Sequence, residues 1–282
     1  LVVDGCAPVI ADNLFDGQYN WDVIAITIVN GAAPSIVSNV IIDYDIGIYA
    51  NGMDMGGIYD NLIMSNNRAG LLVESCTGTI HDNIILENEV AILLRNSDVS
   101  VENNEIGYTD LFQVMANYAT LLSLISETSE PGEVTYDLWD SLDTILAYSS
   151  FDIRSLYDWV TDHTYGIWAE GSTVRTSGNT YGLLSYAVYA IDSEVHFSDD
   201  IRTTEIVIPW VVIGENYVER YNYTADVYTL NGIYAARSDV YVSDCVIEVV
   251  DDALTFEASN AWVEGATLMA GDFDYFVFGG SD

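Results

Sequence analysis

The amino-acid sequence predicts an all-β fold in which short strands coil into a parallel β-solenoid. Three observations predict it: a repeat of 21 to 23 residues, a polar residue at a constant phase of that repeat, and apolar residues two apart between these markers. Residues two apart lie on the same face of a strand, so the alternation indicates strands with one buried face. Coils of such strands stack at ~4.8 Å per turn and bury a continuous core.

The repeat begins at a small residue that is followed by alternating apolar positions. These small residues are Ala25, Gly47, Gly70, Ala91, Gly166, Ala187, Gly232 and Ala253, at spacings of 22, 23, 21, 75, 21, 45 and 21. The two long spacings equal one turn plus insertions of about 54 and about 24 residues. We therefore predict a coil of constant circumference with about nine rungs and two insertions.

Two polar markers follow each small residue and indicate the corners of the coil. Six residues on, the chain places Ser97, Ser172, Ser193, Ser238 and Ser259. Thirteen or fourteen residues on, it places Asn39, Asn61, Asn83, Asn104 and Asn179, and then Asp200, Cys245 and Ala266. Asn tolerates the left-handed backbone of a sharp corner, and stacked Asn amides hydrogen-bond from rung to rung. We expect the Asn residues to form a structural ladder.

The segment NLIMSNNRAGLLVESCTGTIHDNIILENEVAILLRNSDVSVENNEI, residues 61–106, resembles right-handed parallel β-helix repeat proteins. Those proteins include pectate-lyase-like enzymes, tailspikes, copper-insertion accessory proteins and many archaeal surface proteins. The resemblance covers about residues 1–106 and 165–282. It implies a right-handed parallel β-helix, but this scaffold carries many functions, so the resemblance does not choose among them.

The insertions divide the chain into three parts. Residues 1–107 are expected to form the N-terminal rungs, and residues 165–282 the C-terminal rungs. Residues 108–164 are expected to be helical, because Leu111, Met115, Tyr118 and Leu122 follow helical spacing. The segment EIVIPWVVIGENYVERYNYTADVY predicts a protruding β-hairpin near residues 203–229, around a Gly-Glu-Asn turn.

Cys76, His81 and Asp82 are the most conspicuous candidates for a nucleophilic or metal site. Cys76 stands where other rungs have Ser, and Cys6 has the same place in the first rung. His81 and Asp82 stand at corner positions, so we interpret all three as structural. Cys245 also has a structural position. No intrachain disulfide is expected among the cysteines, which leaves free thiols or intermolecular links.

No catalytic constellation and no cofactor is predicted. Carboxylates at successive corners, such as Asp60 with Asp82 or Asp199 with Asp244, are candidates for Ca²⁺ binding, and Asx turns are the structural alternative. The chain has no Lys, and its Arg residues stand at scattered phases, so the basic residue of related lyases has no equivalent. For a hydrolase of the tailspike kind, the first acid pair to consider is Asp251 and Asp252.

The net charge of -37 excludes nucleic acid and anionic membrane surfaces as partners. With half of its residues hydrophobic, the chain is expected to be an extracellular or cell-surface protein. No apolar run approaches the ~20 residues that span a bilayer. The first residue is Leu and no basic-then-apolar segment stands before the first strand, so we expect any export signal to have been removed already. One sequon, Asn222-Tyr223-Thr224, permits N-glycosylation.

Outward positions of the first strands predict an assembly stripe: Tyr49, Leu72, Leu93, Trp168, Tyr189 and Tyr234. A stripe of this size needs a cover, either the helical insertion or another subunit. Neither end of the chain shows a polar capping repeat, which favours end-to-end stacking.

We therefore expect a self-assembling structural protein of a cell-surface sheath or surface layer, such as an archaeal sheath of the methanogen type, that forms hoops or fibres with itself as partner. The alternatives are a polysaccharide lyase, hydrolase or tailspike-like depolymerase, and a carbohydrate-binding adhesion module that uses the outward aromatic residues.

Overall fold

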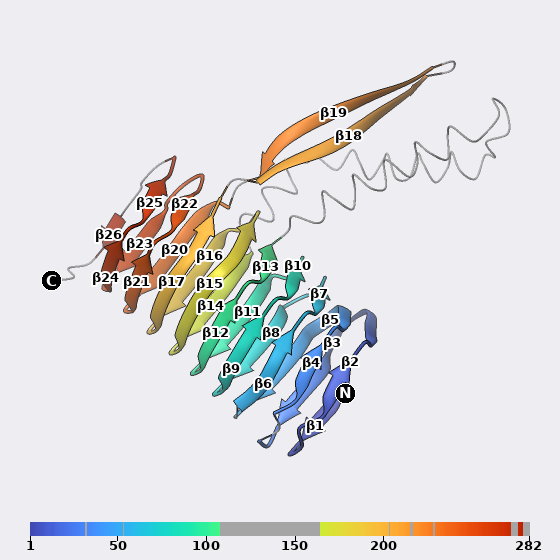
Figure 1. The fold of residues 1–282 in the computed structure, drawn as a ribbon, viewed down its shortest axis with the longest axis vertical. Coiled ribbons are helices and arrows are strands. Elements are labelled where there is room, and N and C mark those ends of the chain that lie inside the picture. Colours follow the sequence, from blue (N-terminus) through green and yellow to red (C-terminus); the bar gives the residue numbers. More distant parts are fainter. Residues whose placement is uncertain are drawn as a thin grey trace.

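The computed structural model describes residues 1–31, 33–52, 54–107, 164–202, 204–214, 217–227, 229–271 and 276–278. In this part of the chain the strands form a parallel β-solenoid, as the repeat predicts, which rises from the N-terminal to the C-terminal rungs (Figure 1). The predicted helical insertion at 108–164 lies outside the described residues except for Thr164.

Each turn contributes strands to three faces, and within each face the strands pair in parallel with the turns before and after. The first face contains β1 (Val2–Asp4), the end of β3 (Leu14–Val29), the end of β5 (Val40–Asn51), β8 (Ala69–Glu74), β11 (Val90–Arg95), β14 (Tyr165–Glu170), β16 (Tyr186–Ile191), β20 (Asn231–Ala236), β23 (Leu254–Glu257) and β26 (Phe276–Phe278). The second face contains β2 (Val9–Ala11), β4 (Ser35–Val37), β6 (Asp54–Tyr59), β9 (Thr77–His81), β12 (Asp98–Glu102), β15 (Thr173–Gly182), β17 (Glu194–Ile201), β21 (Asp239–Ser243) and β24 (Asn260–Glu264).

The third face is the shortest of the three. It contains the starts of β3 and β5, then β7 (Leu62–Met64), β10 (Ile84–Leu86), β13 (Glu105–Gly107), the ends of β15 and β17, β22 (Val246–Glu248) and β25 (Thr267–Met269). Its pairing narrows to a single residue pair between β17 and β22, Ile201 with Ile247. The solenoid is therefore least continuous at this point of the third face.

The core is a set of columns of aliphatic residues that repeat from turn to turn. One column on the first face is in register over eight strands and is fully buried: Ile26, Ile48, Leu71, Ile92, Ile167, Val188, Ile233 and Leu254. β-branched side chains pack well on a pleated surface, so each turn covers the apolar face of the next. This burial is the main stabilising contribution.

Four of the repeats start at a glycine because adjacent turns approach closely there. A Cβ on Gly232 would lie 2.2 Å from the carbonyl oxygen of Ala253 one turn on, and a Cβ on Gly47 would lie 2.6 Å from that of Gly70. Such separations are not possible without a backbone shift. The repeat marker in the sequence is thus a steric marker of turn-to-turn contact.

The corners differ in one respect from the sequence prediction. The left-handed residue is the one before each ladder Asn: Asp60 and Asp82 have φ of 55°, and Asn103 has φ of 54°. The prediction that the ladder Asn itself adopts this backbone was wrong. The left-handed residue makes the turn and so orients the amide of the following Asn, which forms the hydrogen bonds of the ladder.

Between β17 and β20 the chain leaves the solenoid as an antiparallel hairpin. Strands β18 (Thr204–Gly214) and β19 (Tyr217–Val227) pair from Thr204 with Val227 to Gly214 with Tyr217. They form a separate two-stranded sheet, and Figure 1 shows this hairpin projecting from the side of the solenoid. The described part of the chain contains no helix with the length and apolarity needed to cross a membrane.

Candidate functional site

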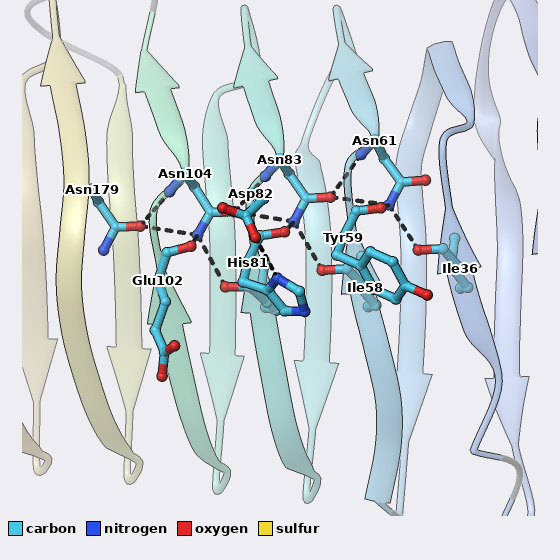
Figure 2. Close-up of polar contacts among 11 residues, drawn as sticks. Ile36, Ile58, Tyr59, Asn61, His81, Asp82, Asn83, Glu102, Asn104 and Asn179 are labelled. Atoms are coloured by element: carbon cyan, nitrogen blue, oxygen red, sulfur yellow. Dashed lines mark hydrogen bonds and ion pairs between the residues drawn. The ribbon is translucent and has the colours of Figure 1, made fainter.

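A ladder of asparagine amides runs along the corner between the second and third faces. The Oδ1 of Asn83 accepts hydrogen bonds from the backbone N–H and the Nδ2 of Asn61 at 3.0 and 2.9 Å. Asn83 in turn donates both groups to the Oδ1 of Asn104 at 3.0 Å (Figure 2). The same two bonds join Asn13 to Asn39, Asn39 to Asn61 and Asn104 to Asn179.

The ladder also ties each corner to the strands beside it. Asn83 Nδ2 donates to the carbonyl oxygens of His81 and Ile58, both at 2.9 Å. Every polar atom of this buried amide therefore has a partner, which is the condition for burying an amide at low cost. The ladder is a structural device, and its side chains are not accessible to a ligand.

The asparagine ladder ends on a buried carboxylate, at Asp199 and not at Asp200 as the spacing predicts. Asp199 accepts from the backbone N–H of Asn179 through Oδ1 and from Asn179 Nδ2 through Oδ2, both at 3.0 Å. Tyr181 donates its hydroxyl to the same Oδ2 at 2.9 Å. A register shift between Ser177 and Thr180 moves the corner by one residue, which the regular spacing does not reveal. Of the candidate Ca²⁺ pair Asp199 and Asp244, Asp199 is 1% exposed and bonded within the ladder, whereas Asp244 is exposed.

The environment of Asp199 is unusual for a carboxyl group. Burial raises its pKa above the ordinary value, and the hydrogen bonds from Asn179 and Tyr181 oppose this only in part. Asp200, one residue on, points to solvent and pairs with Arg202 at 2.8 Å. Burial alone would raise the pKa of Asp200, but hydrogen bonds from Arg202 and from the backbone N–H of Val246 lower it.

A second ladder of hydroxyl groups runs along the corner between the first and second faces. The Oγ of Ser97 accepts from the backbone N–H of Cys76 at 3.2 Å, and Ser97 N–H donates to Ser172 Oγ at 3.1 Å. The series continues through Ser193, Ser238 and Ser259. The Cys76 thiol donates to the carbonyl oxygen of Glu74 at 3.1 Å, as the serines do to the equivalent carbonyl. Cys76 is thus part of a corner and not a nucleophile.

A third, shorter ladder was not recognised in the sequence. Asn66 donates its backbone N–H and its Nδ2 to Asn88 Oδ1, both at 3.0 Å, and accepts from the N–H of Tyr44 at 3.2 Å. These two residues stand 22 apart, as in the main ladder, at the corner between the third and first faces. Their common spacing was the signal that would have identified them.

The three cysteines are free thiols in different surroundings. Cys76 and Cys245 are 2% and 3% exposed, whereas Cys6, which has the place of Cys76 in the first turn, is exposed. Burial and the nearby carboxylates of Asp200, Asp199 and Asp244 raise the pKa of Cys245 to about 11. Its thiolate, the reactive form, is therefore scarce at neutral pH.

We expect a thiol reagent such as DTNB at pH 8 to modify one thiol of the native chain rapidly, Cys6, and all three only after unfolding in urea. The rate of release of the coloured thiolate measures this. A Cys6→Ser variant should then show no rapid phase. Equal rapid reaction of two or three thiols in the native protein would contradict the burial of Cys76 and Cys245.

His81 and Asp82 contact each other at a corner of the solenoid. His81 Nδ1 lies 2.7 Å from Asp82 Oδ2, and the imidazole stacks on the ring of Tyr59 with centroids 4.9 Å apart. Figure 2 shows the imidazole beside the amide ladder, with Asp82 at the turn. The Cys76 thiol lies at the corner between the first and second faces, whereas His81 and Asp82 lie at the corner between the second and third. The three residues therefore do not form a catalytic triad.

The predicted assembly stripe is a continuous row on the outer side of the first face. Tyr49, Leu72, Leu93, Trp168, Tyr189 and Tyr234 are in register on successive strands. Leu72 and Leu93 are buried, and the aromatic residues are half-buried. Tyr165 and Tyr186, on successive strands of the same face, contact each other, and Tyr165 also contacts Tyr189 of the row. These two tyrosines are not among the residues predicted for the stripe.

A second outward row lies on the second face. His196 stacks on Tyr241 with centroids 4.6 Å apart, and Tyr241 stacks on Trp262 at 4.5 Å, with interplanar angles of 7° and 5°. Trp262 is 51% exposed. The 45- and 21-residue spacings of these three residues match the repeat, so the row was recoverable from the sequence.

A polar groove of about 410 Å³ follows the serine corner, but its charged groups are already paired. Arg237 donates to both carboxylate oxygens of Asp192 at 2.7 and 2.8 Å, which lowers the pKa of Asp192 and raises that of Arg237. In the same groove Glu194 pairs with His196, and Asp239 accepts from Asn260. We assign no ligand to it.

Side chains of the types that bind metal ions are spread apart over the part of the chain that the structure describes. No group of three or more His, Cys, Asp or Glu side chains is placed to share a metal ion within the described ranges. Asp60 and Asp82, the first predicted Ca²⁺ pair, stand at exposed corners. Asp251 and Asp252 lie beside Tyr186, on whose pKa both act, and Asp252 accepts from the Thr255 hydroxyl at 3.3 Å.

The continuous parallel coil and its polar corner ladders define a protein of the parallel β-helix repeat class. Residues 11–223, which are more than half of the 282 residues, match the family described as periplasmic copper-binding protein (NosD). The chain belongs to this family. Searches of curated proteins and of solved structures found no match.

The family description names copper, which proteins bind mainly through His, Cys and Met side chains. His81 and His196 are each bound to one carboxylate and lie on different turns, and the two buried thiols lie at different corners. Soft thiolate or thioether groups and imidazoles would have to converge to hold copper. The described residues do not form such a set, and we derive no copper chemistry from them.

Proposed function

We propose that the chain is an exported structural protein of a cell-surface layer or sheath whose copies self-assemble. The observation that carries this proposal is the hairpin β18–β19, which forms a separate sheet of two strands beside the solenoid. An isolated two-stranded ribbon is only marginally stable in water, and both of its edges offer unpaired backbone groups. Such an element is stabilised by contact with another surface.

The sequence of the hairpin supports an interface through its first strand. Residues 206–213 of β18 are all apolar (IVIPWVVI), whereas β19 contains five charged or polar residues: Glu219, Arg220, Asn222, Thr224 and Asp226. A strand that met water on one side would show a polar residue at every second position, and this run of β18 shows none. We therefore infer that β18 contacts another surface, which belongs to a second copy.

The parallel pairing of the solenoid is compatible with end-to-end assembly. The strands of each face pair in parallel from turn to turn, so copies stacked end to end would extend the parallel sheets. Hoops or fibres are the expected products of such head-to-tail contacts.

Location outside the cytoplasm is supported by the family, whose description is periplasmic, and by the net charge of -37, which suits a surface in contact with salt or divalent cations. The proposal needs no catalytic group, and the geometry favours neither the polysaccharide-cleaving nor the adhesion alternative by a specific contact.

The test compares assembly of the native chain with that of a hairpin variant. Val207→Lys with Val211→Lys places two charges within the apolar run of β18, where burial would be costly. We expect light scattering and negative-stain microscopy in salt with Ca²⁺ to show oligomers or fibres for the native chain and monomers for this variant.

The matched control is Ser177→Lys with Ser243→Lys, two exposed positions on the second face. It adds the same charge to the solenoid and should still assemble. A native chain that stays monomeric in all salts, or a hairpin variant that assembles as well as the control, would contradict the proposal.

A further inference from the structure

Five aromatic side chains gather on three successive strands of the first face and form one surface, called here the aromatic cluster: Tyr165, Trp168, Tyr186, Tyr189 and Tyr234. Their rings touch in alternating orientations. Trp168 and Tyr189 are tilted by 57° at a centroid distance of 5.0 Å, and Tyr189 and Tyr234 stack at 4.7 Å. All five side chains are half-buried, so part of each is open to contact.

Carboxylates surround the aromatic cluster. Glu170 accepts a hydrogen bond from Trp168 Nε1 at 3.1 Å, and Glu257 accepts from the Tyr234 hydroxyl at 2.7 Å. Burial raises the pKa of Tyr186, and neighbouring phenols and the carboxylates of Asp252 and Asp251 raise it further. The pKa of Tyr234 rises to about 12 through burial and through Glu257. Burial is the larger cause of both shifts, and the carboxylates beside the rings add to it.

Two of the glutamates on this side of the first face, Glu74 and Glu170, already pair with one Arg of the chain itself. Arg95 Nε lies 3.1 Å from Glu170, and its Nη1 lies 3.4 Å from Glu74 on the previous turn. The other Arg side chains with described ion pairs contact Asp45, Asp98, Asp200 and Asp192. Of these, Arg237, the partner of Asp192, also lies near enough to Glu257 and Tyr234 for both to raise its pKa. The carboxylates of Glu257, Asp251 and Asp252 outnumber this one Arg, so the surface keeps a negative excess, which an external cation would neutralise.

We propose that the aromatic cluster and its flanking glutamates bind an extended basic polypeptide segment, with Lys or Arg side chains over the rings and their charges on the carboxylates. The face of an aromatic ring attracts a cation, and an acidic field concentrates cationic partners near the surface. The cluster covers three strands, a span of ~10 Å, which about three residues of an extended segment match in length. This inference does not depend on self-assembly.

The probe is a fluorescein-labelled octa-arginine peptide, titrated with the native chain and followed by fluorescence anisotropy at low and moderate salt. Trp168→Leu removes a ring, and Glu170→Gln removes a charge. We expect Trp168→Leu to weaken binding about fivefold to tenfold, as the loss of one cation–π contact predicts. Trp168→Phe, which keeps an aromatic face, should lose less.

The matched controls are Trp262→Leu and Glu264→Gln on the second face, where a Trp and a Glu are also exposed. They should change binding less than twofold, because they remove the same groups from a different surface. Equal weakening by both pairs, or no weakening by Trp168→Leu, would overturn the proposal and indicate general attraction to a polyanion. Preferential binding of a neutral glucan oligosaccharide would also overturn it.

Far-UV circular dichroism checks the fold of each variant. If Trp168→Leu does not fold, Glu170→Gln with Glu257→Gln carries the test, since these side chains lie at the surface. Loss of octa-arginine binding in this double variant supports the inference, and unchanged binding overturns it. The hairpin variant that tests self-assembly should bind the peptide like the native chain, so the two proposals fail separately.

Discussion

Asn83→Ala is expected to lower the free energy of unfolding by about 3–5 kcal/mol, because it leaves several buried polar groups without partners. The substitution removes the acceptor of the Asn61 N–H and Nδ2, and the donors to Asn104 Oδ1 and to the carbonyl oxygen of Ile58. Asn61, Asn83 and Asn104 are only 1–2% exposed, so the groups left without partners are buried. Urea unfolding followed by circular dichroism measures the change.

The matched control for this prediction is His81→Ala at the same corner. His81 is bonded to exposed Asp82 and stacks on Tyr59 at the surface, so its loss should cost at most about 1 kcal/mol. If Asn83→Ala and His81→Ala unfold at similar urea concentrations, the amide ladder does not contribute as the hydrogen bonds indicate. The comparison separates the buried amide from its surface neighbours.

Asp199→Asn is expected to stabilise the protein at pH 7, on the order of 1 kcal/mol, by replacing a buried carboxyl with an amide. An amide at this position continues the ladder, because its oxygen accepts the two N–H groups of Asn179 as Asn104 Oδ1 does for Asn83. The Tyr181 hydroxyl, which donates to Asp199 in the native chain, can accept from the new amide.

The size of the stabilisation by Asp199→Asn depends on pH. The folded-state pKa of Asp199 is raised, so the folded chain holds the proton more tightly than the unfolded chain. The contribution of this group to stability is present below the unfolded pKa and is lost as the pH rises through the folded pKa. The gain from Asp199→Asn should therefore be largest at neutral pH and should disappear in acid.

Asp200→Asn is the matched control of opposite sign. The folded pKa of Asp200 is lowered, so its contribution is present above the unfolded pKa and is lost as the pH falls through the folded pKa. This variant should be less stable than the native chain at pH 7 and equal to it in strong acid. Thermal melts of both variants between pH 3 and pH 7 test the pair, and a less stable Asp199→Asn at pH 7 would contradict a raised pKa.

The sequence was sufficient for the fold because a solenoid repeats its own local rules. Close contact between turns requires glycine at four of the repeat starts, Gly47, Gly70, Gly166 and Gly232, and the other repeat starts are alanines. Apolar residues two apart report one buried face, and each turn covers the next. The family match agrees with this class of fold.

The corners show where regular spacing stops being informative. Asp199 replaces Asp200 in the ladder because β15 holds one extra residue at its corner relative to β17, which shifts the register. The left-handed residues precede the ladder asparagines, because the turn geometry and not the amide selects that backbone. The boundaries of the three parts of the chain stay a prediction, as does the helical character expected for residues 108–164.

Periodicity in the sequence by itself determined the parallel coil, the buried aliphatic columns and the places of Ser and Asn at the corners, because each depends only on the next turn at a fixed spacing. Only the tertiary structure decided which groups from different corners and faces come together. It separated Cys76 from His81, buried Asp199 beneath Tyr181, and joined Trp168 to Tyr189 and Glu170. Those contacts depend on side-chain direction and on one-residue shifts of register, which a repeat length does not contain.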